Sequence, residues 1–297
     1  MSLEPTASSG PVDRGRPGGS GEPEVVIASD PTAVATDAAR RVAAILANAV
    51  TARGRVDWAT TGGSSAPGIY RALADAPLRE EVPWSAVHLW WGDDRYVPAD
   101  HPLSNVLPAE QILLHASALA GVSGSGANPL DVQQGATLGV AIPTLQVHAT
   151  RMAEAIGESR GPAWAAARYE AELRESGIAT SDGWPVFDLV LLGVGPDGHV
   201  LSVFPGSAAF ESPDWVVPVP APTHVEPHIS RVTLNPAILD VARDVLVVVT
   251  GESKAEILGR LFGSERDIHR WPAQAVRRSG VTWLVDEAAA TALPGRT

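Results

Sequence analysis

The chain of 297 residues is 45% hydrophobic, enough to build a buried core, and its length predicts one large domain or two modest ones. It has no cysteine, which excludes disulfides and cysteine-bound metal, and no apolar run as long as the roughly 18 residues of a membrane helix. The net charge of −12 argues against nonspecific nucleic-acid binding, which requires clustered Lys and Arg. We therefore expect neither a nucleic-acid nor a membrane partner, and any anionic substrate would need a local basic island.

The N-terminal residues 1–23 are rich in Gly, Pro and Ser, which predicts a disordered tail. This tail has no hydrophobic signal core and mixes acidic residues with Arg, so it fits neither a secretory nor an organellar signal. The absence of cysteine is compatible with a reducing compartment. We expect a cytoplasmic protein.

From residue 24 to residue 292 short apolar strands alternate with helices. Strands are predicted at 24–29, 56–60, 86–91, 186–195, 231–236, 245–250 and 281–286. Helices are predicted from Ser29 or Asp30, through Tyr70, at 163–177 and from Ser253. A Gly- and Ser-rich segment at about 121–140 is predicted to be a surface insertion. This order indicates an α/β fold, with a largely parallel, Rossmann-like sheet, helices on both faces and one domain.

Four polar motifs lie beside the predicted strands, where ligands bind in open parallel sheets. The first, TGGSSAPGIY (residues 61–70), has two glycines that allow close approach of a ligand, before a helix start that offers free N–H groups. The same motif is compatible with a tight turn capped by Ser64 or Ser65. Its spacing is not that of a nucleotide-binding loop.

The second motif is WGDDRYVPADHPLSN (residues 91–105). It places two adjacent carboxylates beside Arg95, directly after a buried strand, where they must be paired or solvated. A solvated loop salt bridge is the simpler interpretation. The length and prolines of the segment favour a shaped loop.

The third motif combines Arg231, which opens RVTLNP, with Lys254 in TGESKAEIL. Ser253 and Glu256 have capping-box spacing, which predicts Lys254 in the first turn of a helix. A lysine is unfavourable beside a helix N-terminus unless an anion is bound there. The alternative is a surface lysine that tolerates the position.

The fourth motif is LVLLGVGPDGHVLSVFPG (residues 189–206), in which Asp197 and His199 lie in a glycine-rich turn. Imidazole titrates near neutral pH and suits a general base, and Asp197 is placed to orient it. A structural histidine is the alternative. In HVEPH (residues 224–228), two histidines hint at a metal site, but Pro227 disrupts the helix that would align them, so no metal is predicted.

Together the motifs resemble those of the 6-phosphogluconolactonase family, within the group that includes glucosamine-6-phosphate deaminases. The first motif is similar to SGGSTPxxLY, the second to GDERxVPxxxxxSN and the fourth to GxGxDGHxASLFPG. RVTLNP and GESKAEIL are similar to the family's R-[IV]-T-[LF] strand and G-x-x-K helix start. The sequence departs from these patterns at Thr61, Ala66, Asp94 and the pair Val200–Leu201.

The resemblance implies hydrolysis of 6-phospho-D-glucono-1,5-lactone to 6-phosphogluconate in the oxidative pentose phosphate pathway. It implies that His199 is the general base, that Asp197 orients it and that Arg95 positions substrate or stabilises the oxyanion. It implies that the substrate and its phosphate are bound by Gly62, Gly63, Ser64, Asp94, Asn105, Arg231 and Lys254. The partner would be a small sugar-phosphate lactone, the protein a monomer or small homo-oligomer, and no cofactor or metal would be required.

Two alternatives remain. A glucosamine-6-phosphate deaminase-like isomerase would share most of these motifs, but deaminases resemble GHIAFNEP after the histidine, where this chain has GHVLSVFPGS. They also usually have tyrosine where this chain has Arg95. A non-catalytic sugar-phosphate sensor would normally carry a DNA-binding helix-turn-helix, for which the tail is too short and too polar.

Overall fold

The computed structural model describes residues 21–114 and 139–295. Residues 1–20 of the predicted tail and residues 121–138 of the predicted insertion lie outside these ranges. Of the remaining tail, Glu22 forms an ion pair with Arg277 (2.9 Å). At the end of the predicted insertion, Val140 is buried.

The centre of the molecule is a seven-stranded sheet in which every neighbouring pair is parallel. Its strands, in spatial order, are β1 (Glu24–Ala28), β12 (Val281–Asp286), β11 (Asp244–Val249), β8 (Leu189–Leu192), β2 (Val56–Thr60), β3 (Val87–Trp91) and β5 (Val147–His148). The central strands β8 (LVLL) and β11 (DVLVVV) are almost entirely apolar, as expected where both faces of a parallel sheet are covered. The predicted fold class is confirmed.

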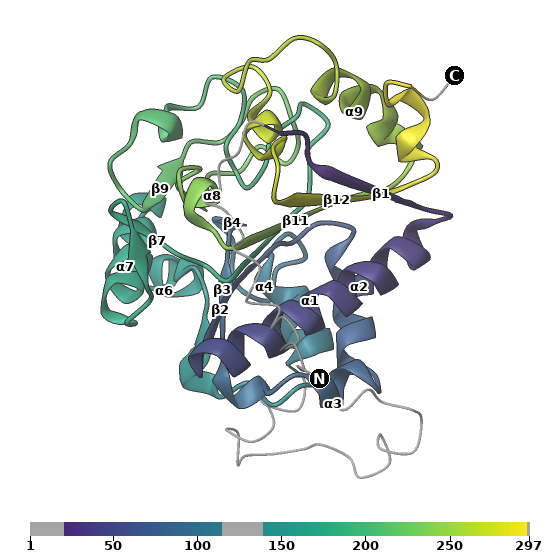
Figure 1. The fold of residues 1–297 in the computed structure, drawn as a ribbon. Coiled ribbons are helices and arrows are strands. Elements are labelled where there is room, and N and C mark those ends of the chain that lie inside the picture. The colour runs from purple at the N-terminus through teal and green to yellow at the C-terminus, as the bar shows by residue number, and fades with distance from the viewer. Residues whose placement is uncertain (1–20, 115–138, 296–297) are drawn as a thin grey trace, which may run out of the picture.

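Helices cover both faces of this sheet, and successive residues of a strand point to opposite sides. On β8, Leu189 and Leu191 pack in one apolar cluster with α1 (Pro31–Arg53) and α2 (Ala66–Ala74). Val190 and Leu192 pack in the other cluster, with residues of α7 (Pro162–Glu175), α8 (Ile238–Val241) and α9 (Ala255–Leu261). Figure 1 shows how the helices are arranged around the sheet. The other α-helices of the described chain are α3 (Leu78–Glu81), α4 (Val106–Pro108) and α6 (Met152–Gly157).

Helix α1 shows how the local sequence sets an element. The Asp30 side chain accepts the N–H of Ala33 (2.9 Å), so Asp30 is the N-cap, one of the two caps predicted. Gly54 ends the helix in the left-handed conformation (φ 72°). Between these ends the buried residues recur at helical spacing, which turns one apolar stripe onto the sheet.

A second, antiparallel sheet was not predicted. It consists of β4 (Asp93–Arg95), β10 (Arg231–Leu234) and β9 (Val216–Val219). The RVTLNP strand therefore does not join the parallel sheet but pairs with β4 and β9. These strands are three or four residues long, too short for a periodic signal. A two-stranded ribbon, β6 (Thr180–Ser181) with β7 (Trp184–Pro185), completes the sheets of the described chain.

The topology creates a crevice at the carboxyl ends of the parallel strands. From β2 the chain moves outward to β3 and β5, then returns to β8 and moves the other way to β11 and β12. The loops that follow β2 and β8 therefore leave the sheet in opposite directions, which is where open α/β sheets bind ligands. In residues 21–114 and 139–295, no helix has both the length and the apolar character needed to cross a membrane.

Candidate active site

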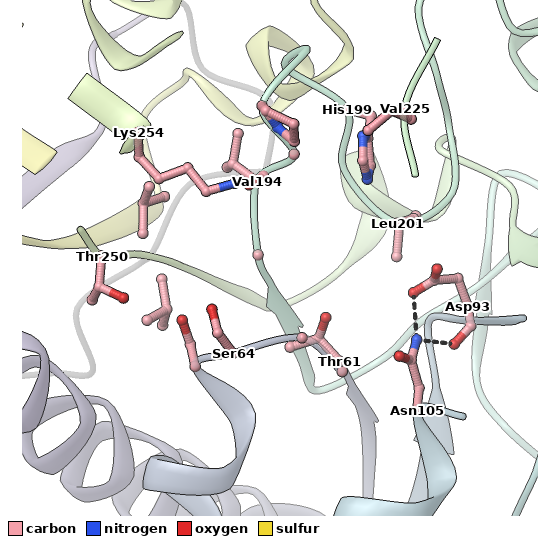
Figure 2. A pocket seen from close by; sticks show the side chains of 18 of the residues that line it. Thr61, Ser64, Asp93, Asn105, Val194, His199, Leu201, Val225, Thr250 and Lys254 are labelled. Atoms are coloured by element: carbon pink, nitrogen blue, oxygen red, sulfur yellow. Dashed lines mark hydrogen bonds between the residues drawn. The ribbon is translucent and has the colours of Figure 1, made fainter. Parts of the chain in front are cut away.

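A cavity of about 260 Å³ lies at this crevice (Figure 2). Its walls come from the segments that follow β2, β3, β8 and β11, together with β10. The sequence-predicted residues that line it are Gly62, Gly63, Ser64, Arg95, Asn105, His199, Arg231 and Lys254. The predicted residues Asp94 and Asp197 are not part of the lining.

The loop after β2 needs its glycines for close packing and for its turn. A Cβ at Gly62 would overlap the Asn105 side chain, and Gly63 is in the left-handed region (φ 78°). Ser65 precedes helix α2, but its side chain forms no capping hydrogen bond. The structure therefore does not show the alternative of a turn capped by Ser65. Ser64 is at the cavity instead, where Figure 2 shows its hydroxyl.

Of the two adjacent carboxylates, the structure places Asp93 in the cavity and Asp94 behind it. Asp94 is buried and accepts the backbone N–H groups of Asn105 (2.7 Å) and Arg95 (2.8 Å). Burial raises the pKa of Asp94 to about 6. Asp94 therefore shapes the loop, whereas Asp93, which was not among the predicted site residues, lines the cavity. Successive residues of a strand face opposite ways, and the sequence does not reveal which one faces inward.

Asp93 is part of the polar floor of the cavity. Its Oδ2 accepts the hydroxyl of Ser202 (2.5 Å), and its backbone carbonyl accepts from Asn105 Nδ2 (2.8 Å). The Asn105 Oδ1 atom is buried and has no hydrogen-bond partner within residues 21–114 and 139–295. An acceptor left in this state is typical of a site that binds a hydroxyl or N–H group of a ligand.

The predicted basic island is present. Arg95 donates to the Leu103 carbonyl (2.8 Å), Arg231 to the Pro227 carbonyl (3.2 Å), and Lys254 to the carbonyl of Val194 (2.7 Å). Each of the three cations thus contacts a neutral carbonyl group. The described residues contribute no carboxylate that forms an ion pair with any of them. Burial lowers the pKa of Arg231 and of Lys254. Three cations around one cavity, none in an ion pair with a described residue, favour an anionic ligand.

The capping-box pattern predicted Lys254 in the first turn of a helix, but in the structure Lys254 lies just before the helix. It ends a 3-10 turn (Glu252–Lys254) and is the N-cap of α9, which has no side-chain capping bond. Glu256 pairs with Arg260 (2.7 Å) instead of capping the helix. The Asp286 carboxylate accepts the N–H of Gly251 (3.0 Å) and fixes the turn before α9, so this helix begins later than the pattern predicted.

His199 and Asp197 form a close pair at the edge of the cavity. His199 Nδ1 lies 2.5 Å from Asp197 Oδ1, and the His199 backbone N–H is 3.2 Å from the same oxygen. Burial raises the pKa of Asp197, but the hydrogen bonds and charge of His199 and the hydrogen bond from His224 outweigh it and hold that pKa well below its usual value. An ionised carboxylate only accepts hydrogen bonds, so Nδ1 carries the proton and neutral His199 keeps Nε2 as the acceptor.

The glycines of this turn make room for the pair. The Gly195 N–H donates to the His199 carbonyl (2.9 Å), and Gly198 adopts a positive φ of 84°. A Cβ on Gly195 would overlap the His199 ring. The turn is therefore built around the imidazole. The sequence alone left open whether His199 is a structural or a catalytic residue.

His224 is a neighbour of the site that the sequence analysis missed. Its Nε2 lies 2.8 Å from Asp197 Oδ2, while His228 contacts the Pro222 carbonyl (2.7 Å). The two histidines of HVEPH thus point to different partners. In the described parts of the chain, no three or more His, Asp or Glu side chains are grouped to hold a metal ion.

The site therefore combines an oriented imidazole with a basic cavity. Such an arrangement can take a proton from water next to a bound anion and return it to a leaving oxygen. Leu201 and Val225 add apolar walls.

The fold is shared with known sugar-phosphate enzymes. The 6-phosphogluconolactonase from Trypanosoma cruzi superposes with a TM-score of 0.72 at 28% identity, covering 93% of this chain and 98% of that chain. A monomeric glucosamine-6-phosphate deaminase superposes with a TM-score of 0.67 at 18% identity, which shows a common fold alone.

Sequence comparison adds the family. The 6-phosphogluconolactonase of Streptomyces coelicolor is 32% identical over 273 residues, covering 92% of this chain and 95% of that protein. That of Mycobacterium tuberculosis is 34% identical over 258 residues, covering 86% and 93%. The model of the family "Glucosamine-6-phosphate isomerases/6-phosphogluconolactonase" matches residues 29–284. The chain therefore belongs to the family of glucosamine-6-phosphate isomerases and 6-phosphogluconolactonases.

Proposed function

We propose that this chain hydrolyses 6-phospho-D-glucono-1,5-lactone to 6-phosphogluconate, the reaction of the oxidative pentose phosphate pathway that its relatives' name describes. One observation carries the proposal. The imidazole of His199, oriented by Asp197, opens onto the same cavity as Arg95, Arg231 and Lys254. A base alone would suit many hydrolases, but a base beside three cations that form no ion pair with a described residue suits an ester that carries a phosphate.

In the first step, His199 Nε2 takes a proton from a water molecule while the water oxygen attacks C1 of the lactone. The carbonyl π electrons move onto oxygen and give a tetrahedral intermediate. We assign the stabilisation of this oxyanion to Arg95, whose guanidinium lines the cavity and forms no ion pair with a described residue.

In the second step, the intermediate collapses and the bond between C1 and the ring oxygen breaks. The imidazolium of His199 gives its proton to that oxygen, which becomes the hydroxyl of the product. The new carboxylic acid then ionises. Asp197 keeps its negative charge throughout and balances the imidazolium.

The phosphate would be held by Gly62, Gly63 and Ser64 with Lys254 and Arg231. Figure 2 shows Lys254 and Thr250 on one side of the cavity and His199, Leu201 and Asp93 on the other. This separation leaves room for a sugar between a phosphate and a reacting carbonyl. The cytoplasmic location and the monomeric or small homo-oligomeric state stay predictions from the sequence.

The proposal is tested by generating the lactone in situ from glucose 6-phosphate with its dehydrogenase and coupling 6-phosphogluconate formation to a second dehydrogenase. The native chain should shorten the lag set by spontaneous hydrolysis, in proportion to its concentration. A lag unchanged by the protein would refute the lactonase assignment. Ammonia release from glucosamine 6-phosphate, measured in parallel, would then support the isomerase alternative.

A further inference from the structure

The carboxylate of Asp197 is held from both sides. Its Oδ1 faces His199 Nδ1 at 2.5 Å, and its Oδ2 faces His224 Nε2 at 2.8 Å. His224 comes from the segment between β9 and β10, whose next residues, Val225 and Glu226, line the cavity. The proposed reaction makes no use of this second histidine.

The bond from His224 has a geometric consequence. In the described chain, His224 provides the only side-chain contact at Oδ2, whereas Oδ1 also receives the His199 backbone N–H (3.2 Å). A carboxylate bonded through one oxygen can turn about its Cβ–Cγ bond, since this terminal torsion is broad. Donors on both oxygens remove that freedom and fix the plane in which Asp197 meets the imidazole of His199.

Ring packing also joins these residues, and it must be separated from the hydrogen bond. The Phe204 ring is buried and lies 4.6 Å from the His199 ring and 5.8 Å from the His224 ring. The Arg231 guanidinium lies 5.1 Å from the same ring. His224 thus contacts the site in two ways, through its Nε2 and through its ring face.

We propose that His224 is a positioning residue for the hydrolysis: its hydrogen bond to Asp197 holds the carboxylate so that His199 keeps its proton on Nδ1 and presents Nε2 to the cavity. This inference rests on the proposed function. His224 itself touches no reacting atom, and it is not part of the cavity lining.

Three variants separate the two contacts. His224→Gln keeps an Nε2–H donor but has no ring, His224→Phe keeps a ring but has no donor, and His224→Ala has neither. If the hydrogen bond positions the base, the Phe and Ala variants lose about ten-fold or more in kcat with little change in KM, and the Gln variant stays near native. His269→Phe, at an exposed histidine that also lies against a phenylalanine ring, is the matched control.

Three other kinetic patterns contradict the proposal. A Phe variant that keeps native kcat while the Gln variant loses it assigns the role to ring packing. Equal kcat in the native protein and all three variants, or equal loss in all three, also overturns it.

A second measurement does not depend on turnover. The ¹⁵N chemical shifts of neutral His199 in the ligand-free protein report which nitrogen carries the proton. We expect the Nδ1–H tautomer in the native and Gln proteins and a mixture of tautomers in the Phe and Ala proteins. A single Nδ1–H tautomer in His224→Phe would contradict the proposal. This measurement decides the role of His224 even if the native chain fails to hydrolyse the lactone.

Discussion

Arg95 and Arg231 lie directly opposite one another on the paired antiparallel strands β4 and β10. Like charges at such a pair destabilise a sheet, and the proximity of Arg95 contributes to the lowered pKa of Arg231. The Nε atoms of both residues are buried, and no described residue accepts a hydrogen bond from either of them. An anion bound between the two guanidinium groups would relieve their repulsion and could accept these free N–H groups.

The first prediction concerns stability. An anion that binds this pair should stabilise the folded protein, so 6-phosphogluconate at ten times its Kd should add about 1.4 kcal/mol to the free energy of unfolding. Differential scanning fluorimetry should then show Tm rising by about 3 °C. Sodium chloride at equal ionic strength is the control. The anion site is refuted if chloride raises Tm as much as 6-phosphogluconate does.

A second prediction separates the adjacent carboxylates. Asp93→Asn should raise KM about ten-fold or more, because Asp93 faces the cavity, whereas Asp94→Asn should keep kcat and KM within about three-fold of native. If steady-state kinetics show a larger effect for Asp94→Asn than for Asp93→Asn, then Asp94 and not Asp93 faces the substrate.

The third prediction follows from the raised pKa of Asp94. Its folded pKa, about 6, exceeds the unfolded value, so the folded protein binds the proton more tightly. The contribution of Asp94 to stability is fully present below about pH 4 and is lost as pH rises to about 6. Asp94→Asn removes this titration. The free energy of unfolding of the variant minus that of the native protein should therefore rise by about 2 kcal/mol between about pH 4 and about pH 6. Urea unfolding at several pH values measures the difference, and parallel pH curves would contradict it.

A fourth prediction uses the fact that Lys254 is the only lysine of the chain. Burial lowers its pKa, so more of the amine is unprotonated and reactive at a given pH than in a free lysine. An amine-selective acylating reagent should therefore modify Lys254, as mass spectrometry of the peptides would show, and abolish substrate binding. Inorganic phosphate should slow the labelling if Lys254 holds an anion. Labelling at the same rate with and without phosphate would exclude that role.

Six strands of the parallel sheet were predictable because they are mostly apolar runs, each separated from the next by a recognisable helix or turn. The seventh, β5, is two residues long and was not predicted. The antiparallel sheet was not, because β4 and β10 are three and four residues long and lie more than a hundred residues apart in the chain. The pairing of Arg95 with Arg231 depends on that sheet. The sequence therefore identified both residues but not that they lie opposite one another on paired strands.

The remaining differences at the site have similar causes. Asp93 and Asp94 are equivalent in the sequence and differ only in which face of β4 they occupy. His224 belongs to a motif that suggested metal binding, and only the folded chain brings it to Asp197. Both depend on contacts between segments that no local pattern encodes.

The most direct test of the central claim is the kcat of His199→Ala on the lactone, measured above the spontaneous rate and beside the native protein. Alanine keeps the Cβ atom and the turn but lacks the imidazole that acts as the base. If His199 is the general base, kcat falls by at least about 100-fold while the Tm gain from 6-phosphogluconate persists. A kcat within about five-fold of native would show that another group moves the proton.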